Sequence, residues 1–336
     1  MTRSSESTQS ESITIAETAR WTRWSGDAIA LLYIALIAMI AHLTGAFYVM
    51  FPELGALSHD VLTRPQGTWA RSPLLLAITP VLTGIVGICV TRWLPYGFFS
   101  VLLTVGGAIA IIALLKSPVA PAISAGLLPL VLGVRSWWYP PGIMLGTFLL
   151  AGLSMALRSV ATSPARASEP DSRDSVRDSV DDTLETPPTG YAWLIALMSF
   201  VAVAILCVRL TGLRFILFPP LVVIGFEMFG HPVTCPWAKI PLWLPAACFL
   251  SAAGGLFFCN TLGVSPLAAG LSMAWGIAVL RIFDLHIPPA LAVALLPMVM
   301  NKPTFTYPLS VLLGTLLLTF WFLYYQSRFS AQEASD

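Results

Sequence analysis

The chain is built from long apolar runs that are separated by short polar interruptions. We distinguish ten apolar segments of 15 to 23 residues, at residues 28–50, 73–91, 94–115, 118–134, 138–158, 191–211, 241–260, 262–283, 286–300 and 307–326. A helix of about 20 apolar residues is long enough to cross the hydrocarbon core of a bilayer. The pattern therefore predicts an all-α fold, a polytopic transmembrane helix bundle.

A polar segment divides these runs into two groups of five. Residues 159–190 contain seven acidic residues, several prolines and few apolar residues, which is typical of a solvated, disordered linker. We expect this linker to be a spacer, with docking or phosphorylation as the alternative. The expected organisation is a polar N-terminal tail (1–27), a first transmembrane repeat (28–158), the acidic linker (159–190), a second transmembrane repeat (191–326) and a C-terminal tail (327–336).

The second group repeats the first at an offset of 168 residues. PAISAGLLPLVLGVRSWWYPPGIMLGTFLL (121–150) aligns without a gap with PALAVALLPMVMNKPTFTYPLSVLLGTLLL (289–318), and 13 of the 30 positions are identical. Biased composition produces chance leucine matches, but it does not produce this shared framework of proline, tyrosine and glycine. Upstream, FPELGAL (51–57) resembles FPPLVVI (218–224) after a slip of one residue. We interpret the pattern as an internal duplication.

Five crossings in each repeat would make the two repeats face opposite ways. With the N-terminus in the cytoplasm and all ten segments crossing, ten Lys and Arg residues fall on the cytoplasmic side. Five fall on the outer side, apart from those in the long linker. This excess agrees with the positive-inside rule, so we expect an inverted repeat. Segments that re-enter the membrane instead of crossing it would change the count.

Composition and charge narrow the possible partners. The 336 residues are 57% hydrophobic and only 10% charged, against about 25% charged residues in soluble domains. The lipid bilayer is therefore the first expected partner, and the plasma (inner) membrane is the expected location. A net charge of +1 gives no electrostatic reason to expect a nucleic acid. The five cysteines show neither a CxxC pair nor metal-ligand spacing, so we expect no metal and no other cofactor.

The fourth segment of each repeat is short and bounded by prolines, as in SPVAPAISAGLLP (117–129) and LHIPPALAVALLP (285–297). Within the membrane, a proline-broken helix is tolerated only inside the protein or beside a wet cavity. Paired broken helices are the pattern with which many transporters build a midplane site, where helix N-termini face an anion. We expect two short helices that meet near a pseudo-symmetry axis at a substrate site, marked by Pro118, Pro121, Pro288 and Pro289. Kinked helices that serve only packing are the alternative.

Charged residues next to these breaks are candidates for a substrate or coupling site. Asp284 aligns with Lys116, and Arg281 and His286 flank it. Charges at membrane depth usually face a cavity. Arg281 and Asp284 are three residues apart, so on one helical face they could instead form a structural ion pair. The pKa range of histidine suits proton coupling for His286, although a buried, hydrogen-bonded histidine is an equal alternative.

A second polar pair lies in FEMFGH (226–231). Glu227 and His231 are four residues apart and share one face if the stretch is helical. They are candidates for a proton relay or gate, and interfacial polar residues are the alternative. A metal site would need more ligands than these two supply.

The layout resembles the HPP family of integral membrane proteins. LHIPPALAVALLP resembles the family's His-Pro-Pro motif at the start of a short apolar helix, with an isoleucine between His286 and Pro288. FPPLVVIGFEMFGHPVTCPWA (218–238) looks like the family's upstream segment. The resemblance covers about 215–325 and extends through the repeat to 51–155, where Pro118 replaces the histidine. Most members are single units, and some are linked to nitrite transport, which implies a small anion as the substrate.

These observations favour a secondary transporter or channel for a small solute, such as the inorganic anion nitrite. One alternative is a membrane-embedded scaffold or assembly partner without transport activity. Another is a membrane enzyme that uses His286, Asp284 and Glu227 on a lipid-soluble substrate. The sequence contains no GxSxG, HExxH, Walker or dinucleotide-binding motif, so we do not expect an enzyme or an ATP-driven pump. A homo-oligomer is compatible with the sequence.

Overall fold

A computed structural model describes the backbone of residues 3–161, 188 and 190–333, and the side chains of residues 24–159, 188 and 190–328. The described residues form 13 α-helices with short 3-10 turns and contain no strand, which confirms the all-α fold. Most of the acidic linker expected at 159–190 lies outside the described residues. Its spacer role therefore stays a prediction.

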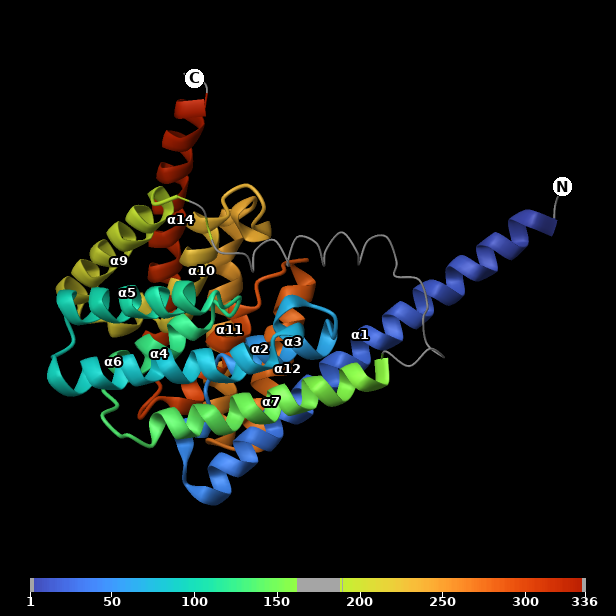
Figure 1. Cartoon of the computed structure of the whole chain (residues 1–336), viewed down its shortest axis with the longest axis horizontal. Helices are drawn as coiled ribbons and strands as arrows, with labels where there is room; N and C mark the ends of the chain where they lie inside the picture. Colours follow the sequence, from blue (N-terminus) through green and yellow to red (C-terminus); the bar gives the residue numbers. More distant parts are fainter. Residues whose placement is uncertain (1–2, 162–187, 189, 334–336) are drawn as a thin grey trace.

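The helices follow one another in the same order in the two halves (Figure 1). The first half contains α1 (Arg3–Thr44), α2 (Leu54–Thr63), α3 (Thr68–Arg71), α4 (Pro73–Trp93), α5 (Phe98–Leu115), α6 (Ala122–Leu132) and α7 (Tyr139–Ala161). The second half contains α9 (Ala192–Thr211), α10 (Pro219–Gly230), α11 (Leu244–Leu262), α12 (Pro266–Ile282), α13 (Pro289–Leu295) and α14 (Thr306–Glu333). Residues 3–25 contain neither glycine nor proline, so nothing interrupts α1 upstream of its apolar part.

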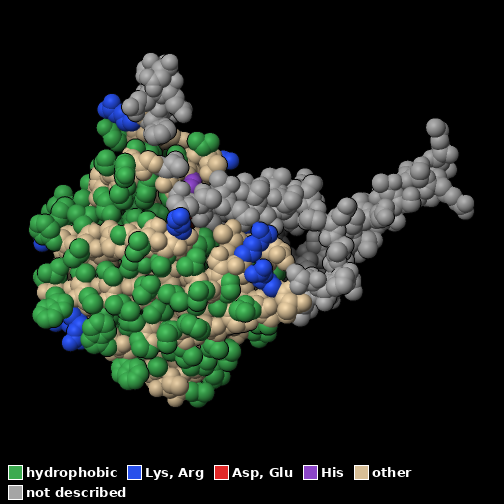
Figure 2. Space-filling model, in the orientation of Figure 1, with side chains coloured by type: hydrophobic (Ala, Val, Ile, Leu, Met, Phe, Trp, Pro, Cys, Tyr) green, Lys and Arg blue, Asp and Glu red, His purple; other side chains and the backbone are tan. Residues whose placement is uncertain are grey.

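In the described part of the chain, seven helices are long and apolar enough to cross a membrane. The candidate spans are Trp24–Thr44, Pro73–Trp93, Phe98–Leu115, Tyr139–Ser159, Ala192–Thr211, Pro241–Leu262 and Thr306–Arg328. Large apolar side chains cover much of the face shown in Figure 2, and Trp93, Phe99 and Leu114 are each more than 80% exposed. Such a surface needs lipid around it, so the chain is an integral membrane protein.

Three of the ten expected segments are shorter than a full span. The helices α6 and α13 are short, as their proline boundaries predicted. Helix α12 has 17 residues, although the sequence predicted a crossing over 262–283. It starts late because Gly263 has a positive φ of 66° and Pro266 occupies the first helical position.

The two halves are interleaved and do not form separate lobes (Figure 1). Helix α1 packs against α12 of the second half, and its counterpart α9 packs against α5 of the first half. In the same way, α2 packs against α13 and α10 packs against α6. Each half therefore places its short helix next to a helix from the other half.

A proline and a tyrosine form a repeated structural unit in the short helices. Pro129 lies inside α6 and has no N–H, so the carbonyl oxygen of Ala125 four residues earlier loses its helical donor. The hydroxyl group of Tyr139 donates a hydrogen bond to that oxygen at 2.8 Å. The second half repeats this arrangement, with a 2.6 Å bond from the Tyr307 hydroxyl to the Val293 carbonyl oxygen.

Close backbone contacts also recur at the offset of 168. A Cβ atom at Gly87 would overlap the carbonyl oxygen of Gly126, and one at Gly255 would overlap that of Ala294. Glycine at both positions lets α4 and α11 approach the short helices closely. Together with the tyrosine bonds, these contacts support the interpretation of an internal duplication.

Candidate functional site

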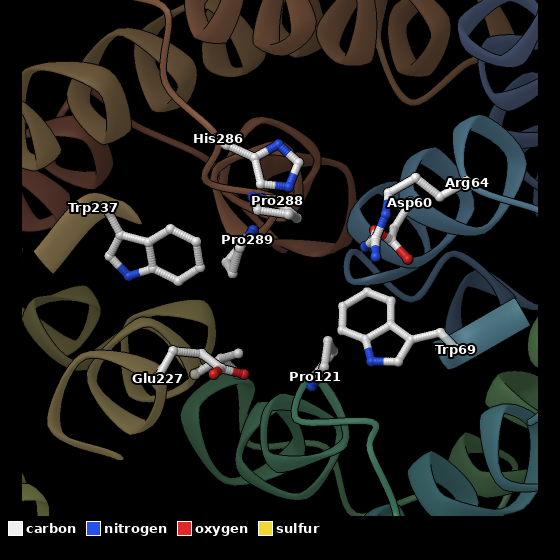
Figure 3. Close-up of a pocket in the computed structure, with 10 residues that line it drawn as sticks. Asp60, Arg64, Trp69, Pro121, Glu227, Trp237, His286, Pro288 and Pro289 are labelled. Atoms are coloured by element: carbon white, nitrogen blue, oxygen red, sulfur yellow. Dashed lines mark hydrogen bonds and ion pairs between the residues drawn. The ribbon is translucent and has the colours of Figure 1, made fainter. Parts of the chain in front are cut away.

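A pocket lies where the N-terminal ends of α6 and α13 come together (Figure 3). It encloses about 400 Å³ of empty space, including its open mouth. Pro121 is the residue before α6, and Pro288 and Pro289 begin α13. The pocket is lined by Asp60, Arg64, Trp69, Pro121, Val223, Glu227, Trp237, His286, Pro288 and Pro289. The two short helices therefore contribute their first residues to one shared cavity.

The pocket lining is paired between the two halves. The pairs are Asp60 with Glu227, Trp69 with Trp237, and Pro121 with Pro289, at offsets of 167, 168 and 168 residues. The indole rings of Trp69 and Trp237 lie on opposite sides of the pocket in Figure 3. Related positions of the two halves therefore face the same pocket.

An ion pair forms one wall of the pocket. Asp60 and Arg64 are four residues apart at the end of α2, so their side chains share one face. A nitrogen of the Arg64 guanidinium lies 2.7 Å from a carboxylate oxygen of Asp60, and both side chains are at least 90% buried. The carboxylate offsets the charge of the guanidinium and holds it in place at the wall of the pocket.

The two indole groups differ in their hydrogen bonds. Trp69 Nε1 donates to the carbonyl oxygen of Pro118 at 2.9 Å, in the turn that leads into α6. Trp237 is 4% exposed, and its Nε1 has no acceptor among the described residues. The residue that corresponds to Pro118 is His286, which lines the pocket itself. The two halves thus share the aromatic walls but not the polar contacts behind them.

Glu227 and His286 add two proton-exchanging groups. Glu227 lies in the last turn of α10 and is 6% exposed, while the half-buried His286 precedes α13. Figure 3 shows the two side chains on different sides of the pocket. Two carboxyl groups, a guanidinium and an imidazole between aromatic walls can bind a small polar or charged solute and exchange protons with it.

Half of the residues predicted from the sequence line this pocket. Those that do are Pro121, Glu227, His286, Pro288 and Pro289, and those that do not are Lys116, Pro118, His231, Arg281 and Asp284. Pro118 contributes indirectly, because its carbonyl oxygen holds Trp69. Lys116 and Asp284 are exposed in equivalent left-handed turns, with φ values of 50° and 48°.

Arg281 and Asp284 do not share one helical face, which was the arrangement required by the alternative of a structural ion pair between them. Helix α12 ends at Ile282, so the turn that follows carries Asp284 away from that face. Arg281 instead forms an ion pair with Asp27 of α1, and its guanidinium lies 4.4 Å from the ring centre of Trp24. Asp27 also lies 3.0 Å from Nε2 of His59. These contacts join α1, α2 and α12 across the two halves.

The sequence reasoning did not select Asp60, Arg64, Trp69 or Trp237 as site residues. The signal for the tryptophans was present, because Trp69-Ala70-Arg71 aligns with Trp237-Ala238-Lys239. Asp60 aligns with Glu227 once the slip of one residue is applied. With the same slip, Arg64 aligns with His231, so in both halves a basic residue follows the acid four positions later.

Residues 184–333 match a protein-family model described as "HPP, transmembrane region". This stretch contains α10, Trp237 and α13, so the resemblance drawn from LHIPPALAVALLP is confirmed for the second half. The first half lies outside the match, and the duplication stays an interpretation of the sequence and of the recurring contacts. Searches of curated proteins and of solved structures found no match.

Proposed function

Because the second half contains an HPP transmembrane region and shares one pocket with the first half, we propose that this membrane protein is a secondary transporter. Its solute is small, an inorganic anion such as nitrite, and its location is the plasma membrane. The observation that carries the proposal is the pocket between the first residues of α6 and α13. Sites between paired broken helices of two related halves are typical of secondary transporters.

The surroundings of the pocket favour transport over a purely structural role. Ionisable groups are costly inside a membrane protein and are usually kept where a solute or a proton is handled. Asp60, Arg64 and Glu227 are ionisable groups of this kind, brought together from both halves. A site between two related halves becomes open to alternate sides when one half rocks against the other.

The choice of an anion rests on Arg64 and on helix α6. The guanidinium has N–H donors in a planar fork that matches two oxygens of a small planar anion. The 11-residue helix α6 begins at the pocket, so the positive end of its dipole adds partial positive charge there. Nitrite has the matching geometry and is the solute that the HPP resemblance implies.

Flux measurements in proteoliposomes that contain the purified chain test this proposal. Nitrite, nitrate, formate and chloride would be compared with and without a pH gradient. We expect saturable nitrite flux that falls at least about tenfold in Arg64→Gln, because a charge-assisted bond is worth roughly 1.5–3 kcal/mol. Lys116→Gln is the matched control, since Lys116 is exposed outside the pocket. Absence of saturable flux for all four anions would contradict the proposal.

A scaffold role predicts the opposite result for the flux of the same variants. If the chain only assembles other proteins, Arg64→Gln changes complex formation and no variant changes flux. The membrane-enzyme alternative required His286, Asp284 and Glu227 to act together. Asp284 does not line the pocket that holds the other two, which favours transport over catalysis.

A further inference from the structure

Glu53 is a deeply buried carboxyl group outside the pocket lining. It directly precedes α2 and is 1% exposed. Among the described residues, no hydrogen-bond donor reaches either carboxyl oxygen with ordinary geometry. The hydroxyl group of Ser124 in α6 is near enough to act on the carboxyl group. A charged carboxylate is strongly disfavoured in such surroundings, so the group favours holding a proton.

Two helices connect Glu53 to the pocket. Ser124 lies one turn into α6, three residues after Pro121 in the pocket lining. Asp60 lies seven residues after Glu53 on α2, which corresponds to about 10 Å along the helix axis. Glu53 therefore lies behind the pocket, within reach of the electrostatic effect of a bound charge.

The groups around Glu53 do not neutralise its charge. Tyr139 and Tyr307, one from each half, lie near enough to interact with it electrostatically. Both hydroxyl groups already donate to backbone carbonyl oxygens. Helix α13, which packs against α2, has no titratable side chain. The other elements packed against α2 contribute Asp27, Tyr33 and the exposed His42 among the described side chains of α1, Arg71 from α3, and Arg158 from α7. Helix α2 and the residue after it add His59, Asp60 and Arg64.

Most of these surrounding groups have partners of their own. Asp27 pairs with His59 and Arg281, and Arg64 pairs with Asp60. Tyr33 donates to the carbonyl oxygen of Gly146, and Arg158 donates to that of Ala70. Burial and Ser124 are accordingly the influences that act on the Glu53 carboxyl group.

The repeated frame does not need a carboxyl group at this position. Pro220 stands at the corresponding place in the second half, one residue into α10. The same turn thus forms without the acid, so Glu53 is not required to shape it. A costly buried acid that the repeated frame does not need points to a functional role.

We propose that Glu53 is the proton-binding site that couples solute loading in the pocket to a proton. This inference rests on the proposed transport function. A bound anion and a charged Glu53 repel each other, so anion binding favours the protonated acid and protonation favours anion binding by the same factor. The carboxylate binds one proton as one monovalent anion loads, and both are released on the opposite side. Transport of a monovalent anion is then electroneutral symport.

Proton movement driven by a solute gradient tests the coupling. Proteoliposomes with a pH-sensitive dye inside would receive an inward nitrite gradient at alkaline pH, where little membrane-permeant nitrous acid is present. We expect the wild type to take up protons with nitrite and Glu53→Gln to lose about tenfold or more of that proton uptake. Asp284→Asn is the matched control, because it makes the same chemical change at an exposed position. Proton uptake at the wild-type rate in Glu53→Gln would overturn the inference.

Infrared spectroscopy separates failure of the inference from failure of the proposed function. The C=O stretch of a protonated acid should appear when nitrite is added to the purified wild type at alkaline pH, and it should be absent in Glu53→Gln. If this band is missing from the wild type, Glu53 is ionised and the inference is wrong even where nitrite is transported. If the band is present and no anion is transported, the coupling falls together with the proposed function.

Discussion

The two halves of this protein have the same frame but differ in its polar groups. In the first half, the Thr83 hydroxyl donates to the carbonyl oxygen of Ala122 at 2.6 Å, and the hydroxyl oxygens of Thr79 and Ser117 lie 2.8 Å apart. At the corresponding places, the second half has Ser251 without a hydrogen-bond partner, and Ala247 and Leu285. The polar contacts behind α6 are therefore largely missing behind α13.

This difference distinguishes the contacts that stabilise the helix packing from the polar side chains that belong to the candidate site. The tyrosine bonds and glycine contacts recur in both halves because each solves a local backbone problem that proline or close helix packing creates. Polar side chains that solve no such problem are free to differ. Two differences are of this kind: Glu53 corresponds to Pro220, and His286 corresponds to Pro118. His286 lines the pocket and Glu53 lies behind it.

Glu53, which has no carboxyl counterpart in the second half, should have the largest effect on stability. Burial raises the pKa of Glu53, which lies outside the seven candidate spans, from 4.5 to about 8. Between those values the folded protein binds more protons than the unfolded chain, so stability should fall as pH rises through this window. The loss should total roughly 5 kcal/mol and end above the raised pKa. Unfolding in detergent from pH 4.5 to 8 measures it.

Glu53→Gln is the control for this pH dependence. The amide does not titrate, so the difference in stability between the wild type and the variant isolates the contribution of Glu53. A difference that stays constant with pH would show that the carboxyl group is not buried as a neutral acid. The contrast with Pro220 would then have no electrostatic consequence.

The glycine contacts test whether the frame is equally tight in both halves. Gly87→Ala and Gly255→Ala should each cost about 3 kcal/mol or more, because the new methyl group overlaps a backbone carbonyl oxygen. Thermal unfolding in detergent measures the loss. Gly270→Ala in α12 is the control, since open space surrounds it, and it should gain about 0.5–1 kcal/mol. If only one of the two alanine substitutions is destabilising, the helices are not packed equally tightly in the two halves.

The hydrogen bonds of Tyr139 and Tyr307 should contribute similar amounts to the stability of the two halves. Tyr139→Phe and Tyr307→Phe each leave a buried carbonyl oxygen without its donor, at an expected cost of about 2 kcal/mol. Chemical unfolding of the two single variants and the double variant would measure these costs. Values that differ by more than about 1 kcal/mol would show that only one half depends on the hydroxyl group.

The contributions of the Trp69 and Trp237 indole groups to stability should differ. Trp69→Phe loses the hydrogen bond to Pro118, whereas Trp237→Phe loses none that the structure describes. Both variants lose a similar area of aromatic packing, so the comparison isolates the bond. We expect Trp69→Phe to be less stable than Trp237→Phe by about 1 kcal/mol in thermal unfolding. Equal losses would mean that the N–H group of Trp237 finds an acceptor of its own.

The smallest effects should come from the two left-handed turns. Lys116 and Asp284 have positive φ values, a conformation that glycine adopts without strain. Lys116→Gly should stabilise the protein by about 0.5–1 kcal/mol, and Asp284→Gly by less, because aspartate tolerates this region better than lysine. Precise thermal unfolding would resolve the order. Destabilisation by either change would show that the side chain has a role that the turn geometry does not reveal.

Much of the architecture could be predicted from local patterns. The apolar runs predicted the helices, and the proline boundaries predicted that α6 and α13 are short. The prediction that both mark one site is supported by the shared pocket, although their function stays a proposal. The expected crossing over 262–283 proved shorter, because Gly263 and Pro266 delay the start of α12.

Side-chain partners were much harder to predict. An ion pair with the nearby Asp284 was one alternative for Arg281, but Arg281 pairs with Asp27, which lies 254 residues away in the chain. Nothing in the spacing of these residues indicates the contact, because it depends on α1 packing against α12 of the other half. The Asp60–Arg64 pair was local in sequence, yet its position in the pocket required the fold.

The sequence by itself determined the properties that belong to single residues and short runs. These are the transfer of apolar segments into lipid, the helix breaks at proline, and the offset of 168 between the two halves. Only the tertiary structure decided that the halves interleave, that Asp60 and Glu227 share one pocket, and that Glu53 is buried behind it. Those results depend on which helices pack together and on the surroundings that this packing creates for each side chain.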